Sequence, residues 1–544
     1  MSVYQRAKEI INLNRDTIWV VFVYAAAIAL LSLIIPIAAQ SLVNVVSFGT
    51  LLQPVVVLTV IVFAVLTVVA GMRIAQAIVV ETIQQRMFAQ IGIKLAKILP
   101  ESQVKNFDEY RVSELVNRFF EVQTIQKALA ILLVTGIEIS LLAVFSMVLI
   151  AFYHPLLLAF DIVLVISLFI ALWLPWKKAL HFAIEECAAK HEFAAWLEEI
   201  VHNIFLFKMQ NHQNYSLSVA DERISTYLVA RKKHFKNILK HLFGINIIYV
   251  VANAALLGIG GYLVIKEQLS LGQFVASELI INALLYGFVR FSFYLEDLYD
   301  LLAACFKLGN LMSLPLEKPG TIAKTHLTAI EAKLSLPPKI EAKKISYLTN
   351  KNTVLFQGLN FAVNAGKTLV VQGNKGTGKS LLVDILLGFR LVKTGSIQIN
   401  GIPVQEYNLV DIRKYAALVR HIELFSGSIF DNLVMHRADI AIETIHKYLN
   451  EFQLTKTIEV LPDGLDTFIS GSQMTMSTIE LKKLMFIRAV LTQPSFLVID
   501  ATLDDLPAVD LDIFLPYLKQ YPGTKIITTR RQDIASFFES VLQL

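Results

Sequence analysis

The stretch from Gly373 to Ser380 has the residue types and spacing of a site that binds phosphate groups. Its glycines, which include Gly376 and Gly378, allow the backbone to curl so that successive N–H groups point at phosphate oxygens. Lys379 can then reach the β- and γ-phosphates of a nucleotide, and the hydroxyl of Ser380 can bind Mg²⁺. The predicted phosphate-binding residues are Gly373, Asn374, Lys375, Gly376, Thr377, Gly378, Lys379 and Ser380.

An aspartate that follows a second apolar run can share a metal ion with this loop. Residues 495–499 read Ser-Phe-Leu-Val-Ile, and Asp500 comes next. If the run is a buried strand, the carboxylate lies at its C-terminal edge and can hold the water shell of Mg²⁺ beside Ser380. The two segments together predict a nucleotide site that holds Mg²⁺ indirectly, through Ser380 and Asp500.

A strand before the loop and a helix after it must position these groups. The apolar run Leu369–Val371 predicts a buried strand, and the sequence is helical from Leu381 onward. The N-terminus of that helix faces the phosphates, where its dipole favours negative charge. The full Gly-x-x-x-x-Gly-Lys-Ser spacing between a strand and a helix is far more specific than a glycine-rich turn alone.

The composition of the whole chain is that of a membrane protein with a soluble domain. Of the 544 residues, 55% are hydrophobic and 17% charged, with a mean hydropathy of +0.58. These values exclude a disordered chain, a collagen-like fibre and a disulfide scaffold. The net charge of +5, from 49 basic and 44 acidic residues, is too small to indicate a nucleic-acid partner.

Long apolar segments before residue 315 predict six membrane-spanning helices, since a bilayer core of about 30 Å needs about 20 apolar residues. Eight Lys or Arg lie in residues 73–127 and ten lie in residues 176–240, so both of these loops and both termini are predicted to be cytoplasmic. The membrane is expected to be an inner or plasma membrane. The predicted spans lie near residues 17–42, 51–72, 128–153, 156–175, 241–265 and 271–295.

Two shorter segments flank the spans. Residues 1–14 carry Val3, Ala7 and Ile11 on one helical face and predict an interfacial helix on the inner leaflet; a frayed leader is the alternative. Residues 313–340 contain four prolines, which indicates a linker. The expected organisation is a transmembrane domain at 1–315, a linker at 316–340 and a nucleotide-binding domain at 341–544.

Six spans, two long basic loops, a linker and a phosphate-loop domain resemble a half-transporter of the ABC family with the type I exporter fold. The resemblance implies a polytopic α-helical membrane domain followed by an α/β nucleotide-binding domain, with ATP and Mg²⁺ as cofactors. It also implies a dimer in the lipid bilayer, either of two copies or with a second half-transporter. The segments similar to the family lie at residues 100–118 and 199–213 (the two coupling loops), 261–276 (the turn before the sixth span), 395–401, 424–433 and 461–467.

Several positions that this family uses for ATP hydrolysis carry other residues here. The Leu-Ser-Gly-Gly-Gln signature falls on a segment in which only Ser477 is retained. The glutamate that orients or deprotonates the attacking water is replaced by Ala501, and a positioned general base is typically worth about 10²–10⁴ in rate. Asp504 and Asp505 could replace this base, although acids in such turns are more often solvated. The signature-loop residues are Met476, Ser477, Thr478, Ile479 and Glu480.

Three nucleotide contacts of the family are also altered. The switch glutamine falls on Arg420 and the switch histidine on Arg530. These arginines could hold nucleotide near the γ-phosphate, or they could point to solvent. The adenine-stacking aromatic falls on Thr349, but Tyr347, two residues earlier, lies on the same face of a strand and could stack instead.

The sixth predicted span carries polar residues at every fourth position: Glu278, Asn282, Tyr286 and Arg290. This spacing places them on one slowly drifting helix face. Ionisable groups at membrane depth cost about 2.5–3.5 kcal/mol on insertion scales, so they require an explanation. They could line the substrate pathway, since the family's sixth helix borders the central cavity, or they could fix helix packing through hydrogen bonds.

The sequence therefore predicts an ATP-binding half-subunit of an exporter that couples nucleotide binding to substrate movement, with slow or absent ATP hydrolysis. The alternative is a non-catalytic pseudo-transporter that acts as a regulatory or partner subunit. The sequence leaves the transported substrate open among lipids, peptides, secreted proteins and drugs.

Overall fold

The computed structural model divides the chain into two compact units. One unit comprises residues 1–102 and 106–315, and the other comprises residues 103–105 and 316–544. The division after residue 315 coincides with the end of the predicted transmembrane domain. The structure describes residues 3–12, 15–47, 52–109, 115, 117–209, 213–317, 327–348, 354–470 and 476–544.

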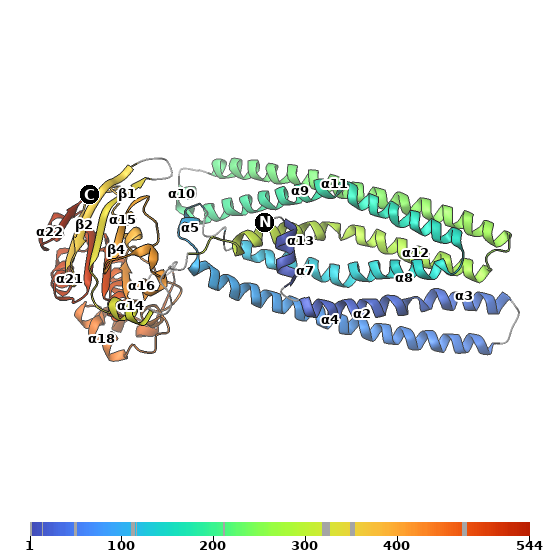
Figure 1. Cartoon of the computed structure of the whole chain (residues 1–544), viewed down its shortest axis with the longest axis horizontal. Helices are drawn as coiled ribbons and strands as arrows, with labels where there is room; N and C mark the ends of the chain where they lie inside the picture. The colour runs from blue at the N-terminus through green and yellow to red at the C-terminus, as the bar shows by residue number, and fades with distance from the viewer. Residues whose placement is uncertain are drawn as a thin grey trace. The chain divides into compact units, whose positions relative to one another are not determined.

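The first unit consists of long helices that run side by side (Figure 1). Within the described residues, six helical segments are long and apolar enough to cross a membrane, as the sequence predicts: 15–47, 53–101, 118–151, 155–202, 214–265 and 271–293. Several of them extend well beyond the predicted spans, because the amphipathic loop sequences continue the helix. The helices are α1 (Val3–Asn12), α2 (Arg15–Ser32), α3 (Ile34–Ser47), α4 (Gln53–Glu101), α5 (Lys105–Glu109), α7 (Glu121–Ile131), α8 (Ile137–Ala151), α9 (Pro155–His202), α10 (Ile204–Lys208), α11 (Gln213–Ile265), α12 (Leu271–Phe293) and α13 (Leu295–Met312).

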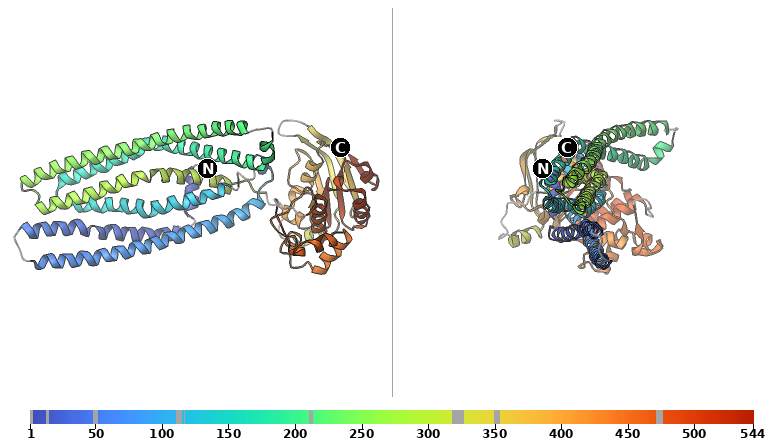
Figure 2. Two further views of the ribbon diagram at one scale, coloured as in Figure 1. Left: turned by 180° about the vertical axis from the view of Figure 1, so that it is seen from behind. Right: turned by 90° about the vertical axis from the view of Figure 1, so that its right-hand side faces the viewer.

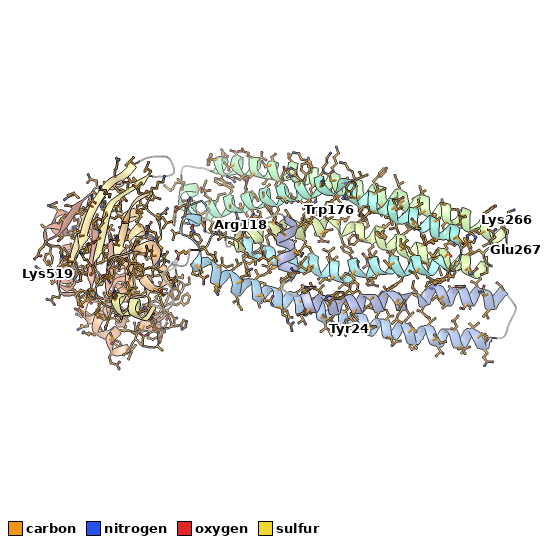
Figure 3. All side chains as sticks on the ribbon, viewed as in Figure 1. Tyr24, Arg118, Trp176, Lys266, Glu267 and Lys519 are labelled. Carbon is orange, nitrogen blue, oxygen red and sulfur yellow. The ribbon has the colours of Figure 1, made fainter. Side chains whose placement is uncertain are left out.

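Local sequence signals set where these helices begin. Pro155 opens α9, where its missing N–H costs nothing, and His154 Nδ1 accepts a hydrogen bond from Leu156 N at 3.1 Å. A reciprocal capping box between Ser270 and Gln273 opens α12. The turn before α12, which holds Lys266 and Glu267, lies at one end of the helical unit, and Arg118 lies toward the other end (Figure 3).

The N-terminal segment forms helix α1, and one of its faces packs on α13. Ala7 is buried, and the guanidinium of Arg6 donates to the Phe306 carbonyl oxygen at 2.9 Å. The other views of the ribbon also place the N-terminal end within the helical unit (Figure 2). One face of α1 therefore contacts α13, and the position of α1 at the membrane surface stays a prediction.

The second unit contains an antiparallel sheet of order β2-β1-β4-β5 and a parallel sheet of order β11-β3-β10-β9-β6. Helices pack against these sheets, as expected for the predicted α/β domain. The strands are β1 (Ile340–Leu348), β2 (Val354–Val363), β3 (Thr368–Gln372), β4 (Thr394–Ile399), β5 (Ile402–Pro403), β6 (Ala416–Val419), β7 (Gly427–Ser428), β8 (Phe468–Ile469), β9 (Phe496–Asp500), β10 (Thr524–Thr529) and β11 (Val541–Gln543). The helices are α14 (Leu327–Leu334), α15 (Lys379–Leu386), α16 (Leu409–Lys414), α17 (Ile429–Val434), α18 (Ile442–Glu451), α19 (Thr455–Val460), α20 (Thr478–Leu491), α21 (Ala508–Gln520) and α22 (Gln532–Ser536).

The register of the parallel sheet brings the two predicted nucleotide-site segments together. In β10, Thr529 pairs with Gln372 of β3 and Thr528 pairs with Asp500 of β9. The C-terminal ends of these strands therefore meet at one edge of the sheet. The apolar runs predicted as buried strands are buried, with Val371 in β3 and Ile499 in β9 both fully inaccessible to solvent.

The predicted linker contains regular structure. Helix α14 lies within it, and Leu334 at the end of this helix is 3% exposed and packs in the same core as Ile340 of β1. The part of the linker closest to β1 is thus anchored to the nucleotide-binding unit. Residues 318–326 of the predicted linker lie outside the described residues.

Candidate functional site

The predicted phosphate loop connects β3 to α15, as the sequence indicates. Gly376 and Gly378 have φ angles of 91° and 95°, which side chains on L-residues rarely permit. Gly373 has no room for a side chain, because a Cβ there would lie 2.6 Å from the Leu544 carbonyl oxygen. The remaining loop residues, Asn374, Lys375 and Thr377, complete the turn, and the Thr377 hydroxyl donates to the Asn374 carbonyl oxygen at 3.1 Å.

Lys379, the first residue of α15, turns its ammonium group into this loop. Its Nζ donates to the carbonyl oxygens of Gly373 at 2.7 Å and Asn374 at 2.8 Å, and the residue is 8% exposed. Burial lowers the pKa of Lys379; the negative charge of Asp504 opposes this shift and the positive charge of Arg530 adds to it. The loop therefore has the backbone geometry and the ammonium group that a nucleotide phosphate site requires.

Asp500 at the end of β9 lies beside Ser380, as predicted. Its Oδ1 accepts from Ser380 Oγ at 3.1 Å and from Thr528 Oγ1 at 2.6 Å. Its Oδ2 accepts from Arg420 Nε at 2.9 Å. The residue is 5% exposed, so its carboxylate is a buried charge that these three donors stabilise.

Arg420 follows β6 and enters the site, which excludes the alternative that it points to solvent. Besides Asp500, its Nη2 contacts Asp384 Oδ1 at 2.7 Å and the Ser380 carbonyl oxygen at 3.3 Å. Burial lowers the pKa of Arg420, but the hydrogen bonds and charges of Asp384 and Asp500 outweigh this and raise it above its ordinary value. The guanidinium is therefore a fixed positive charge between two carboxylates.

Sequence reasoning did not identify Asp384 as a member of the site. This residue lies one helical turn after Ser380 on α15, and its Oδ2 accepts from Arg390 Nε at 3.0 Å. The spacing of four residues from Ser380 was a signal that both side chains share a helix face. The spacing alone did not place Asp384 in the site, because the cation that binds it, Arg420, lies 36 residues further along the chain.

The oxygen donors of Ser380 and Asp500 are of the kind that Mg²⁺ prefers, but their arrangement does not fit the ion. A carboxylate offers about four lone-pair sites, and three of those on Asp500 already have donors. The Arg420 guanidinium also brings positive charge directly to the Asp500 oxygens. The prediction of Mg²⁺ at these two residues thus rests on donor type alone.

The position of the expected general base is held by Ala501, which follows β9 and has a φ of 56°. Its methyl group has no proton-accepting atom. Asp504, three residues later, has a 2% exposed side chain, so it is not the solvated turn acid that the sequence suggested. Its carboxylate accepts from the Thr529 hydroxyl and from Arg530 N and Nε, the latter at 3.1 Å. Arg530, which is half exposed, thus binds the carboxylate of Asp504 in the same chain.

The structure describes the signature loop from Met476 onward, and residues of this loop hydrogen-bond to one another. Met476 is buried, and Ser477 is the N-cap of α20. Ser477 Oγ accepts from Glu480 N at 3.3 Å, while Glu480 Oε2 accepts from Ser477 N at 2.7 Å. Hydrogen bonds from Ser477 and Thr457 outweigh burial and lower the pKa of Glu480. A carboxylate therefore occupies the helix N-terminus, with Thr478 and Ile479 beside it in the first turn.

Tyr347 lies in β1, next to an aromatic residue that packs against the phosphate loop. Its ring centroid is 6.4 Å from that of Phe356 in β2. Phe356 in turn packs under the loop, since a Cβ on Gly378 would lie 3.3 Å from its ring. This places Tyr347 one side chain away from the loop, while Thr349 lies outside the described residues.

The polar stripe of α12 lies on the less buried side of that helix. Tyr286 and Arg290 are exposed in the single chain, and Glu278 and Asn282 are half-buried. The opposite side of the helix packs in the interior through Ile280, Ile281, Leu284 and Leu285. The stripe is thus available to the pathway or to another chain, and the structure does not bury it among its own helices.

A polar cluster that the sequence did not reveal joins α7 and α9 in the first unit. Glu121 Oε1 accepts a hydrogen bond from His191 Nε2 at 2.6 Å and lies 3.8 Å from Cys187 Sγ. Lys190 Nζ is 3.6 Å from the same carboxylate oxygen, and Lys307 Nζ donates to the Cys187 carbonyl oxygen at 3.1 Å. Two ammonium groups beside one carboxylate disfavour a metal cation, so the cluster is a buried ion-pair network.

Comparison with known proteins agrees with this geometry. Residues 18–288 match the family described as the ABC transporter transmembrane region, and residues 356–503 match the family described as ABC transporter. A proposed export ATP-binding/permease protein of Rickettsia felis is 24% identical over 443 residues, which span 80% of this chain and 75% of that protein. The alpha-hemolysin translocation ATP-binding protein of Escherichia coli O157:H7 is 23% identical over 76% of this chain and 58% of its own length.

A solved structure shows the same fold. The chain of a bacterial Atm1-family ABC exporter with ATP bound superposes with a TM-score of 0.85 at 16% identity. The alignment covers 98% of this chain and 94% of that chain. The likeness therefore includes both the helical unit and the nucleotide-binding unit.

Proposed function

The chain belongs to the ABC transporter family and has the type I exporter fold of a half-transporter, and from this premise we propose that it is an exporter half-subunit driven by nucleotide binding. It binds ATP at the phosphate loop and hydrolyses it slowly or not at all. It lies in an inner or plasma membrane with both termini in the cytoplasm. Nucleotide binding is coupled to movement of a substrate across that membrane.

The observation that carries this proposal is the contrast within one site. The phosphate loop is complete, with Lys379 buried in it, yet Ala501 stands where a base would act on water. Losing a positioned general base costs about 10²–10⁴ in rate. Tyr347 and Arg530 are further candidates for contact with the bound nucleotide, through stacking and charge respectively.

The signature loop adds a second reason for slow turnover. In this family the loop of one subunit faces the γ-phosphate held by its partner. Here the Glu480 carboxylate already satisfies the N-terminus of α20, which would otherwise favour a phosphate. In a homodimer both composite sites combine this loop with Ala501, and with an intact partner each site keeps one of the two defects.

The alternative function is a non-catalytic partner or regulatory subunit, and the self-capped signature loop favours it. The two functions differ in what the chain does alone in a membrane. ATP-dependent substrate movement by vesicles that contain only this chain indicates a homodimeric exporter. Movement that requires a second half-transporter with an intact base and signature indicates a partner subunit.

ATP binding by the full chain in lipid nanodiscs tests the proposal. We expect Lys379→Ala to weaken ATP affinity at least about tenfold, because it removes the ammonium group that contacts the phosphates. Lys519→Ala is the matched control, since Lys519 is exposed on α21 and outside the site. An ATP affinity that is unmeasurable in the wild type, or equal in all three proteins, contradicts the proposal.

A further inference from the structure

The positive charge in the nucleotide site is supplied by a side chain where such sites usually use a metal ion. Arg420 donates to Asp500 Oδ2 at 2.9 Å, to Asp384 Oδ1 at 2.7 Å and to the Ser380 carbonyl oxygen at 3.3 Å. Two of these residues, Ser380 and Asp500, are the predicted Mg²⁺ residues. The guanidinium therefore lies against the groups that the ion would use.

Contacts of the backbone also fix the position of Arg420. The Thr502 hydroxyl lies 2.7 Å from the Arg420 carbonyl oxygen and 3.2 Å from the Val419 carbonyl oxygen. Val419 pairs with Ile499 in the parallel sheet, one residue before Asp500. The arginine and the aspartate thus follow neighbouring strands at the same edge, and 20% of the Arg420 side chain remains exposed.

The two carboxylates nearby, Asp384 and Asp500, are already paired with guanidinium groups. Asp384 binds Arg420 through Oδ1 and Arg390 through Oδ2, at 2.7 and 3.0 Å. Asp500 has three donors, one of them the Arg420 guanidinium. With Lys379 also in the loop, a Mg²⁺ ion here would meet two neighbouring cations and carboxylates that are already paired.

The Arg420 guanidinium can bind phosphate oxygens, which is one of the roles of a metal ion in such a site. It is always protonated, and it presents five N–H donors in a plane that matches phosphate oxygens. Its Nε and Nη2 are used by the carboxylates, whereas Nη1 has no hydrogen-bond partner among the described residues. The Nη1 N–H groups are therefore the donors that the guanidinium retains for a phosphate oxygen.

We propose that Arg420 takes the place of Mg²⁺ in this site, so that the chain binds nucleoside triphosphate without a divalent cation. The inference rests on the ATP binding proposed above and adds the chemical form of the ligand: the metal-free triphosphate. A permanent charge anchored by two carboxylates can bind phosphate without a metal ion, and it lacks the exchangeable metal-bound water of an ordinary hydrolytic site.

The test measures ATP affinity of the full chain in nanodiscs, once with excess Mg²⁺ and once with excess EDTA. We expect the wild-type affinity in EDTA to be at least as high as in Mg²⁺, because excess Mg²⁺ competes with the protein for the metal-free triphosphate. Arg420→Gln, which restores the residue of the family, is expected to bind ATP at least about tenfold more weakly in EDTA than in Mg²⁺. Arg413→Gln is the matched control, because Arg413 forms a bidentate ion pair with Glu317 outside the site.

The outcomes separate this inference from the proposed function. Wild-type affinity that is lower in EDTA than in Mg²⁺ overturns the inference but leaves ATP binding intact. An Arg420→Gln protein that still binds ATP at least as well in EDTA as in Mg²⁺ also overturns it, since another group must then replace the ion. Absence of wild-type ATP binding in both conditions overturns the proposed function and the inference with it.

A second measurement keeps the inference testable if Arg420→Gln does not fold. Mn²⁺ is a paramagnetic substitute for Mg²⁺, and its resonance spectrum changes when protein ligands bind it. In the presence of wild-type protein and ATP, we expect only the spectrum of Mn²⁺ bound to free ATP. A protein-bound Mn²⁺ signal in the wild type that disappears in Ser380→Ala overturns the inference.

Discussion

At the scale of single residues, Ala501 and Asp504 decide what chemistry the site can perform. Ala501 offers no proton acceptor, and the carboxylate of Asp504, three residues later, is buried. Both oxygens of Asp504 are occupied by donors from Thr529 and Arg530. A carboxylate held in this way anchors the C-terminal end of β10 and is a poor base for water.

The Asp504→Asn variant tests this assignment. We expect the rate of ATP hydrolysis to remain equal to that of the wild type, and the protein to lose about 1–3 kcal/mol of stability because buried donors lose a charged acceptor. Thermal unfolding and phosphate release in nanodiscs measure the two effects. Asp512→Asn is the matched control, since Asp512 is exposed on α21 and its change should cost less stability.

A fall of the wild-type hydrolysis rate in Asp504→Asn, with Asp512→Asn unaffected, would contradict this view. Asp504 would then replace the missing glutamate as the base. The ion pair that it forms with Arg530 would in that case position a catalytic group, and slow turnover would need a different cause.

At the scale of elements, helix α12 presents two chemically distinct faces. Ile281 and Leu284 face the interior of the helical unit, while Tyr286 and Arg290 lie on the exposed side of the single chain. A membrane-spanning helix does not direct an arginine to lipid without cost. The exposed face is therefore expected to border water or a second subunit.

The Tyr286→Cys variant tests whether this face lines an aqueous pathway. A maleimide reacts with thiolate, which forms in water and not in lipid, so we expect Tyr286→Cys to react at least about tenfold faster than a lipid-facing cysteine. Val163→Cys on α9 is the matched control, because Val163 is apolar and 63% exposed. The native Cys187 and Cys305 are buried and should contribute little background.

Equal, slow labelling of Tyr286→Cys and Val163→Cys would show that the α12 face does not contact water. The polar stripe of Glu278, Asn282, Tyr286 and Arg290 would then serve helix packing or subunit contact. Labelling that depends on added ATP would in addition connect the nucleotide-binding unit to the pathway.

At the scale of the whole molecule, the sequence predicted the elements better than it predicted their polar contacts. Six spans and the strand–loop–helix around Lys379 were predictable because apolar runs and glycine spacing are local signals. The pairing of Arg420 with Asp384 and Asp500 was not, because strand order brings together residues from three separate segments. Asp504 was expected in solvent because the sequence does not show that Arg530, 26 residues later, binds its carboxylate.

The same contacts explain why a complete phosphate loop does not imply an active ATPase. The phosphate loop supplies backbone geometry and one lysine for nucleotide binding, all contributed by residues 373–380. Hydrolysis in addition needs a base, a metal site and the partner's signature loop. Here Ala501, Arg420 and Glu480 stand at those three places, which supports the proposal that hydrolysis is impaired while ATP binding is kept.

The central claim is that this half-transporter binds ATP and does not turn it over efficiently. The most direct test measures ATP binding and steady-state MgATP hydrolysis on one nanodisc preparation, with Lys379→Ala as the background. The account predicts clear ATP binding by the wild type together with a hydrolysis rate indistinguishable from that of Lys379→Ala. A wild-type rate of about 1 s⁻¹ or more, the lower end for ordinary enzymes, that is lost in Lys379→Ala would contradict it.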